Sequence, residues 1–152
     1  MNKRRIAVTL ASCASMVGFG LVAAEPAAAA ATSPEGACGA GYSRLQSVGM
    51  GWSSQNQEYS ARTYLLYSSA TGNNCVVTMR SPGWYGNGTE LIEAGVQAQG
   101  GSLKKDRGNY KYYAGPVYVK AVNTCVRYVG GVQYVDNGVF WDSYTSPYGW
   151  CG

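Results

Sequence analysis

The sequence predicts an all-β protein, a small antiparallel β-sandwich or barrel of seven or eight strands with two disulfides. Three observations predict it. Short runs rich in Val, Thr and Tyr alternate in polarity with the period of a strand. Turn signals recur every 8–15 residues through the body of the chain. Four cysteines fall in that body, after a segment typical of export.

Residues 1–31 have the pattern of a secretory signal peptide. A basic stretch at 3–5 precedes an uncharged apolar run over 6–24, and 27–31 offers several A-x-A cleavage frames. We place the cleavage after Ala31, which leaves residues 32–152 as a single secreted domain. The general secretory route fits better than the twin-arginine route, because the residues around the arginine pair match a twin-arginine signal poorly. An extracellular location follows, at the spore or hyphal surface if the resemblance described below holds.

Two alternative interpretations of this segment are possible. One is an uncleaved membrane anchor, against which the adjacent alanine frames argue. The other is a lipobox over residues 10–13, which would place a lipid on Cys13. The chain after Cys13 stays apolar and lacks the polar tether of a lipoprotein, so Cys13 is interpreted as part of the apolar run.

Four cysteines in an exported body indicate two disulfides. They are Cys38, Cys75, Cys125 and Cys151. Three connectivities are open, and we favour Cys38–Cys75 with Cys125–Cys151 because the two loops are then sequential and do not cross. The loop-entropy model assigns each bridge about 3.5–4 kcal/mol. No C-x-x-C pair is present, so a zinc site or a redox pair is disfavoured.

The first half of the body predicts one clear hairpin. Residues 32–36 are expected to be a loose start and 49–60 a surface loop. The runs 63–67 and 75–80 flank a Gly-Asn loop and predict two paired strands. Alternation places Cys75, Val77 and Met79 on one face of the second strand.

The second half predicts the remaining strands. Residues 91–98 favour a strand over a helix because apolar residues alternate there and Gly95 interrupts any helix. Residues 109–122 predict a strand with a bulge, bend or edge at Gly115-Pro116. Gly130-Gly131 is expected to be the two-residue turn of a hairpin between 125–129 and 132–135. A turn at 136–138 precedes a last strand at 139–141.

The expected mature chain has low charge and no histidine. It holds nine basic and seven acidic residues, a net charge of +2. Without histidine, Ser-His-Asp and Cys-His hydrolases and His-ligated metal sites are excluded. The small charge argues against a nucleic-acid partner, and the basic cluster at 104–107 is interpreted as a solvated turn. No apolar run after residue 31 is long enough for a transmembrane helix.

The sequence contains no recognisable catalytic motif. Nothing in the spacing brings two of the seven carboxylates together, and Glu90 and Glu93 would face opposite sides of a strand. Neither an S-x-x-K motif nor a D-x-D-x-D-G calcium loop occurs. We therefore expect a protein that is not an enzyme, has no cofactor, and carries its carboxylates as solvated surface groups.

Aromatic residues are the most suggestive part of the composition. Thirteen Tyr, four Trp and one Phe follow residue 31. Packing in the core and at its boundary is the simpler interpretation, because the aliphatic residues of the predicted strands supply little bulk. The functional alternative is an exposed aromatic surface that stacks on sugar rings or on another surface. Its candidate residues are Trp52, Trp84, Tyr110, Tyr112, Tyr148 and Trp150.

Several segments of the body also carry a family resemblance, in the family's order. They are residues 38–42 (CGAGY), 64–67 (YLLY), 72–78 (GNNCVVT), 96–99, 112–117 (YYAGPV), Cys125 with Gly130-Gly131 after it, and 146–152 (SPYGWCG). With these segments the chain resembles the spore-associated protein A family of filamentous, sporulating actinobacteria. The stretches 49–60, 82–90 and 102–108 carry no such resemblance. The resemblance implies a small secreted protein of aerial hyphae and spore surfaces, without known catalytic activity and with no functional residues beyond its cysteines.

Three hypotheses for function follow. The first is a secreted, non-enzymatic protein of the spore or aerial-hypha surface, with cell-wall glycan or spore-coat proteins as its partners. The second is a carbohydrate- or cell-wall-binding module, which a row of exposed aromatic residues would favour. The third is a small secreted wall-acting enzyme or an inhibitor of one, and a pocket with two close carboxylates would favour an enzyme. Scattered and largely buried aromatic residues would leave the first.

Overall fold

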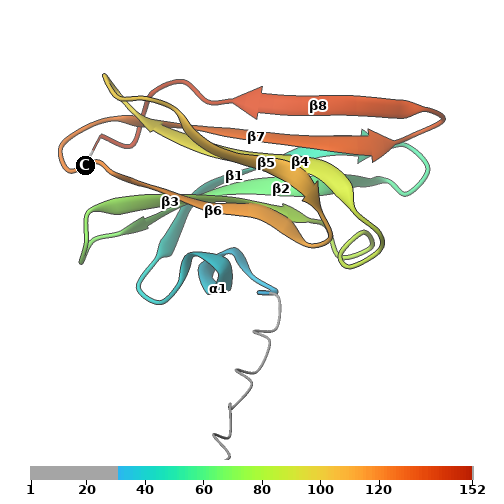
Figure 1. Ribbon diagram of the computed structural model, residues 1–152, viewed down its shortest axis with the longest axis horizontal. Coiled ribbons are helices and arrows are strands. Elements are labelled where there is room, and N and C mark those ends of the chain that lie inside the picture. Colours follow the sequence, from blue (N-terminus) through green and yellow to red (C-terminus); the bar gives the residue numbers. More distant parts are fainter. Residues whose placement is uncertain (1–30, 152) are drawn as a thin grey trace, which may run out of the picture.

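The computed structural model describes residues 31–151 as two four-stranded antiparallel sheets stacked face to face, with one short helix against the outside of the first sheet (Figure 1). Apart from Ala31, the predicted signal peptide lies outside the described residues. The elements are α1 (Pro34–Cys38), β1 (Ser43–Ser53), β2 (Glu58–Ser68), β3 (Asn73–Arg80), β4 (Glu90–Ala98), β5 (Lys104–Tyr110), β6 (Tyr113–Lys120), β7 (Val126–Val135) and β8 (Val139–Thr145).

The strand order confirms the predicted fold class. The first sheet runs β1-β2-β3-β6 and the second β5-β4-β7-β8, with every pair antiparallel. The sheets do not close on each other, so of the two predicted architectures the structure is the sandwich. The eight strands agree with the expected seven or eight.

Apolar side chains at every second position fill the space between the sheets. Leu65 and Val76 of the first sheet meet Ile92 and Val96 of the second, and all four are fully buried. Burial of side chains of this size contributes about 1.5–3 kcal/mol each. The period-2 pattern of the strands thus fixes which face of each sheet turns inward.

A second, smaller core lies on the outside of the first sheet, beneath α1. Cys75, Val77 and Met79 of β3 share this outer face, as their alternation predicts. α1 begins with Ser33, whose Oγ accepts a hydrogen bond from the Gly36 N–H at 3.0 Å. A helix of five residues is not stable alone, so its packing here and its disulfide hold it. The loose start expected for 32–36 is therefore wrong.

Both disulfides have the favoured connectivity. Cys38–Cys75 ties α1 to β3, and Cys125–Cys151 ties the residue before β7 to the C-terminal segment. The C-terminal segment also pairs with β7, because Gly149 exchanges two backbone hydrogen bonds with Val126. Each bridge thus anchors a piece of chain that has few partners of its own.

The predicted hairpin turn at Gly130-Gly131 is wrong, because β7 runs straight through both residues. A Cβ on Gly130 would lie 1.8 Å from Thr63 Oγ1 in the other sheet. A Cβ on Gly131 would lie 2.3 Å from the ring of Trp141 on the opposite face. These glycines mark close approach by neighbours on both sides of the strand rather than a reversal of the chain.

Three other expectations about loops are corrected. Residues 49–60 form the ends of β1 and β2, with the turn confined to 54–57. The basic cluster at 104–107 lies in strand β5 and not in a turn. The segment 109–122 is not one strand, because β5 ends at Tyr110 and β6 begins at Tyr113. Gly115-Pro116 does form the expected irregularity, where the β3–β6 register shifts.

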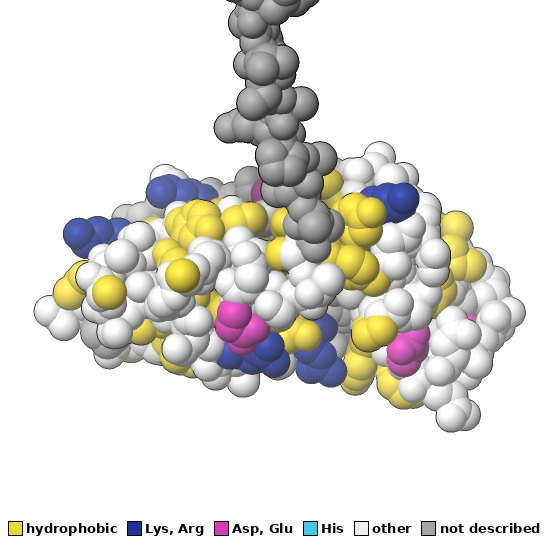
Figure 2. Space-filling model, turned by 90° about the horizontal axis from the view of Figure 1, so that it is seen from below, with side chains coloured by type: hydrophobic (Ala, Val, Ile, Leu, Met, Phe, Trp, Pro, Cys, Tyr) yellow, Lys and Arg dark blue, Asp and Glu magenta, His cyan; other side chains and the backbone are white. Residues whose placement is uncertain are grey.

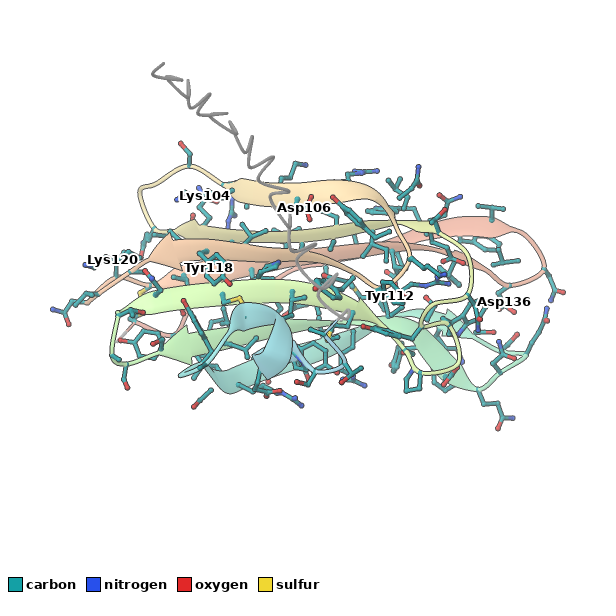
Figure 3. All side chains as sticks on the ribbon, turned by 60° about the horizontal axis from the view of Figure 1, so that its bottom comes forward. Lys104, Asp106, Tyr112, Tyr118, Lys120 and Asp136 are labelled. Atoms are coloured by element: carbon teal, nitrogen blue, oxygen red, sulfur yellow. A yellow bond between two sulfur atoms is a disulfide. The ribbon has the colours of Figure 1, made fainter. Side chains whose placement is uncertain are left out.

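Three aspartates join the two sheets rather than lying in solvent. Asp142 of β8 accepts from the Gly51 N–H of β1, and Asp106 of β5 accepts from the Gly115 N–H of β6. Asp136 accepts from Ser54, which links the β7–β8 turn to the β1–β2 turn. Figure 3 shows Asp106 on β5 and Asp136 at one end of the sandwich. The expectation of solvated carboxylates is therefore wrong for these groups.

Candidate functional site

A groove of about 680 Å³ lies on the outside of the first sheet, beside α1. Its walls come from Trp52 of β1, from β2 and β3, from the 81–85 loop and from the chain entering α1. Figure 2 looks onto the α1 side and shows hydrophobic side chains gathered there, with charged groups at their margins. The volume falls within the range of small-ligand sites.

Aromatic rings form much of the groove. Trp52 and Tyr59 pack edge to face, with 5.1 Å between ring centroids. The Tyr59 ring rests on Gly49, where a Cβ would lie 2.4 Å from it. Tyr85 packs against Tyr112 at 4.9 Å. Because each ring is held by a neighbour, the aromatic surface of the groove is largely preorganised.

The Trp52 ring is the most open part of this wall. Its side of the groove is formed where β1 ends and β2 begins, and the residue keeps 48% of its surface exposed. A half-exposed indole held in place by Tyr59 offers a flat apolar surface together with one N–H donor. Such a surface suits stacking on another flat group.

Planar polar side chains share the groove with the rings. Gln57, Glu58 and Arg62 line it, and the Arg62 guanidinium lies 5.8 Å from the centre of the Tyr59 ring. The Glu58 carboxylate rests against Gly83, where a Cβ would lie 2.6 Å away. Burial raises the pKa of Tyr85, with smaller contributions from Tyr113 and Tyr112, so its hydroxyl stays protonated at neutral pH.

Two of the six predicted aromatic residues belong to this region. Trp52 lines the groove, and Tyr112 supports Tyr85 from behind. The neighbouring Trp84 is half-buried in the 81–89 loop. The six predicted residues are therefore spread over several places and do not form one row.

The other three predicted residues lie elsewhere. Tyr110 packs against the core between the sheets and donates to Asp106, and this hydrogen bond is the main cause of its raised pKa. Trp150 packs against Tyr128 near the C-terminal disulfide. It also lines a smaller pocket of about 220 Å³. Tyr148 lies under the Arg127 guanidinium, 5.0 Å from it.

Sequence reasoning missed most of the groove. Tyr59, Tyr64, Tyr85 and Arg62 line it. Of these, Tyr64 lies in the YLLY segment of the family resemblance, but nothing there marks it as a binding residue, and the other three lie in segments without a distinctive motif. The one local signal was glycine, because Gly49 and Gly83 stand where side chains of the groove press on the backbone. A glycine alone does not tell which side chain will cover it.

A buried ion pair borders the groove, because Arg80 is one of the residues that line it. Arg80 Nη2 and Glu90 Oε1 are 3.4 Å apart, and the Arg80 side chain is almost wholly buried. Burial lowers the pKa of Arg80, while Glu90 opposes this. Burial likewise raises the pKa of Glu90 against the effect of Arg80. Arg80 also donates to the carbonyls of Asn87 and Gly88, so the pair fastens the 81–89 loop.

The described carboxylates are mostly occupied in ion pairs or in the sheet contacts. Glu35 binds Arg44, Glu90 binds Arg80, and Glu93 binds Lys105 and Arg107. Among residues 31–151, Glu58 is the one carboxylate that lines the groove. A glycosidase needs two carboxylates across its substrate, so the groove does not have that arrangement.

Within residues 31–151, no group of three His, Cys, Asp or Glu side chains is arranged to hold a metal ion. In the same part of the chain, no helix is long and apolar enough to cross a membrane.

Comparison with known proteins supplies one relative. The chain is 40% identical over 121 residues to spore-associated protein A of Streptomyces coelicolor, an alignment covering 76% of this chain and 72% of that protein. No family model matches the chain. No solved structure matches it either.

Proposed function

Because the chain belongs to the spore-associated protein A family, we propose that it is a secreted, non-enzymatic protein of the spore or aerial-hypha surface. The observation that carries this proposal is the relative, whose name records association with spores. Two disulfides support an extracellular location, since such bonds persist in oxidising surroundings. They also tie down both ends of the described chain, which suits a protein exposed to drying and proteases.

The roles of the carboxylates support the non-enzymatic part of the proposal. Acid–base catalysis needs a group free to exchange protons with a substrate. In residues 31–151, six of the seven carboxylates instead bind a basic side chain or a donor in the opposite sheet. Three of the six, Asp106, Asp136 and Asp142, link the two halves of the sandwich.

The experiment is to locate the protein in a sporulating culture of its own host. Antibody to the purified chain is applied to intact spores, hyphae and culture medium, before and after salt and detergent washes. We expect the signal on spores and aerial hyphae, with retention through the salt wash. Protein found only in the medium or the cytoplasm would contradict the proposal. Incubation with wall polymers tests the non-enzymatic part, because any release of soluble fragments would contradict it.

The groove supports a second and more specific candidate, binding of a neutral wall glycan. Sugars are recognised by aromatic rings that stack on their apolar faces and by planar polar side chains that bind their hydroxyls. Trp52 supplies an exposed ring, while Arg62, Glu58 and Gln57 supply planar donors and acceptors. Arg62 and Glu58 carry opposite charges, and Arg80, which also lines the groove, is paired with Glu90. The groove therefore has little net charge, which favours an uncharged ligand over an ionic one.

Binding is tested with purified, oxidised protein on insoluble cellulose, chitin and peptidoglycan, with soluble sugars as competitors. We expect saturable binding to one polymer that its sugar displaces. Trp52→Ala should weaken it about tenfold, because stacking and apolar contact of this size contribute about 1–2 kcal/mol. Phe140→Ala is the matched control, since Phe140 is an equally exposed ring outside the groove. Equal loss in both variants, or no binding to any polymer, would overturn the glycan proposal and leave the location untouched.

A further inference from the structure

One face of the domain carries three basic side chains and one acidic one. The outer face of the second sheet, which points away from the first sheet, carries Lys105, Arg107 and Arg127 against Glu93. The other six basic and six acidic side chains of residues 31–151 cancel. The whole net charge of +2 therefore lies on this face, which we call the basic platform. It is made of those four residues together with Trp141 and Tyr148.

One half of the basic platform is built around Glu93. Its carboxylate is nearly buried and lies 3.2 Å from Arg107 and 3.4 Å from Lys105. One negative charge thus holds two positive ones, each on a side chain that remains about half exposed. The surplus charge and most of the N–H donors of Lys105 and Arg107 remain open to solvent.

Trp141 is set into the same half by a glycine. Its ring covers Gly131, where a Cβ would lie 2.3 Å away, and the Arg107 guanidinium stacks 4.4 Å from the ring centre. The indole nevertheless keeps 39% of its surface exposed. Gly131 thus allows a flat ring close to the sheet, directly beside the two cations.

The other half repeats the arrangement of arginine on an aromatic ring. Arg127 Nε donates to Gln97 Oε1 at 2.8 Å, and the guanidinium lies 5.0 Å from the Tyr148 ring. Arg127 is four residues from Gly131 along β7, a separation of about 13 Å. The two guanidinium groups therefore lie at separate places on one sheet face, each against an aromatic ring.

We propose that the basic platform binds an anionic wall polymer linked by phosphodiesters. Guanidinium groups match the two free oxygens of a phosphodiester, and Arg107 and Arg127 are already oriented by their rings. Separate cationic groups on one face suit a flexible polymer that can adjust its charges to their spacing. Duplex DNA carries a charge every 1.7 Å, and a face with a net charge of +2 neutralises little of it.

This site is separate from the groove, which lies on the outside of the opposite sheet. The inference depends on the proposed surface location in one respect only, because that location is what would bring the protein into contact with a wall polymer. Its failure can therefore be distinguished from failure of the proposed function, because spore location and neutral-glycan binding do not involve the basic platform.

The test measures affinity of the purified, oxidised protein for poly(glycerol phosphate), with polygalacturonate, duplex DNA and dextran as comparison polymers. We expect tightest binding to poly(glycerol phosphate), weakening as salt screens the charges. Lys105→Gln with Arg107→Gln should weaken it about tenfold. Lys111→Gln with Lys120→Gln is the matched control, because it removes the same charge from exposed residues off the platform. Figure 3 shows Lys120 at the end of the molecule away from Asp136.

Tryptophan fluorescence gives a second measurement that needs no charge substitution. Bound polymer should change the emission of the parent protein and of a Trp52→Phe variant, but not of Trp141→Phe. Equal loss of affinity in the two double variants would overturn the proposal. So would tighter binding of DNA, equal binding of polygalacturonate, an emission change that survives Trp141→Phe, or no binding at low salt.

Discussion

Asp142 Oδ2 accepts a hydrogen bond from the backbone N–H of Gly51, 2.8 Å away in the other sheet. At the opposite edge of the sandwich, Asp106 accepts from the Gly115 N–H at 2.7 Å. Both glycines have positive φ, and the register between β3 and β6 also shifts beside Gly115. A residue with a side chain rarely adopts that conformation, so glycine is what allows each edge strand to turn an N–H toward the carboxylate. A hydrogen bond from a glycine N–H to an aspartate thus links the two sheets at both edges of the sandwich.

Asp142→Ala should lower the free energy of unfolding by about 1–3 kcal/mol, because the Gly51 N–H is left without its charged acceptor. Urea denaturation of the oxidised protein measures this change. Asp136→Ala is the control, since its hydrogen bonds to Ser54 are exposed and should contribute less than about 1 kcal/mol. An equal loss in both variants would contradict a special role for the Asp142–Gly51 contact.

Gly130→Ala should destabilise the protein by about 2–3 kcal/mol. The added methyl would lie 1.8 Å from Thr63 Oγ1, and Thr63 cannot move freely because it is buried and bonded to Thr78 at 2.8 Å. Gly149→Ala is the matched change, because no atom lies within 4 Å of its added Cβ and it should be nearly neutral. Thermal or urea unfolding compares the two. If Gly130→Ala left the free energy of unfolding unchanged, the two sheets would be able to move apart at this point with little loss of stability.

Stability should fall as pH rises from about 10 to 12, through Tyr128. Burial, with a lesser effect of Tyr144, raises the pKa of Tyr128 to about 12 from the ordinary 10.0. Above pH 10 the unfolded chain therefore loses a proton that the folded chain retains, and each pH unit favours unfolding by about 1.4 kcal/mol. Tyr128→Phe should flatten this slope in urea melts between pH 9 and 12. If the dependence of stability on pH were the same in Tyr128→Phe as in the parent protein, Tyr128 would not be its cause.

Replacing both Cys38 and Cys75 by alanine should cost about 3.8 kcal/mol by the loop-entropy model for a separation of 37 residues. The same change at Cys125 and Cys151, with a separation of 26, should cost about 3.5 kcal/mol. The two losses of stability are similar, but we expect the two variants to differ in which part of the structure is exposed. Without Cys38–Cys75, α1 is free to leave and expose Leu66, Val77 and Met79. Hydrophobic dye binding under native conditions should rise in that variant alone.

Glycine shows where inference from the sequence fails. Gly130-Gly131 between two apolar runs is locally the same signal as a tight turn. In the structure the pair is a place where Thr63 approaches from one side and Trp141 from the other. Thr63 is 67 residues away in the chain, so no local pattern could reveal it. The turn at 136–138 was predicted correctly because its residues determine its shape among themselves.

The candidate sites depend even more on distant contacts. Trp52 could be selected from the sequence only as one of many aromatic residues. Its partner Tyr59 and the guanidinium of Arg62 reach the groove because β1 and β2 pair in one particular register. Trp141 was not selected at all, because nothing in its own segment distinguishes a ring on a glycine from a ring in the core.

The all-β class, the alternation that separates Val76 from Cys75 and Val77, and the four cysteines available for bridging can all be read from the order of the residues. These properties depend on each residue and its immediate neighbours. The packing of the two sheets, by contrast, is needed to see that glycines inside β7 accommodate side chains, that aspartates join the two sheets, and that the outer face of the second sheet carries a surplus of positive charge. Those properties arise from strand order and register, which bring together residues that are far apart in the chain.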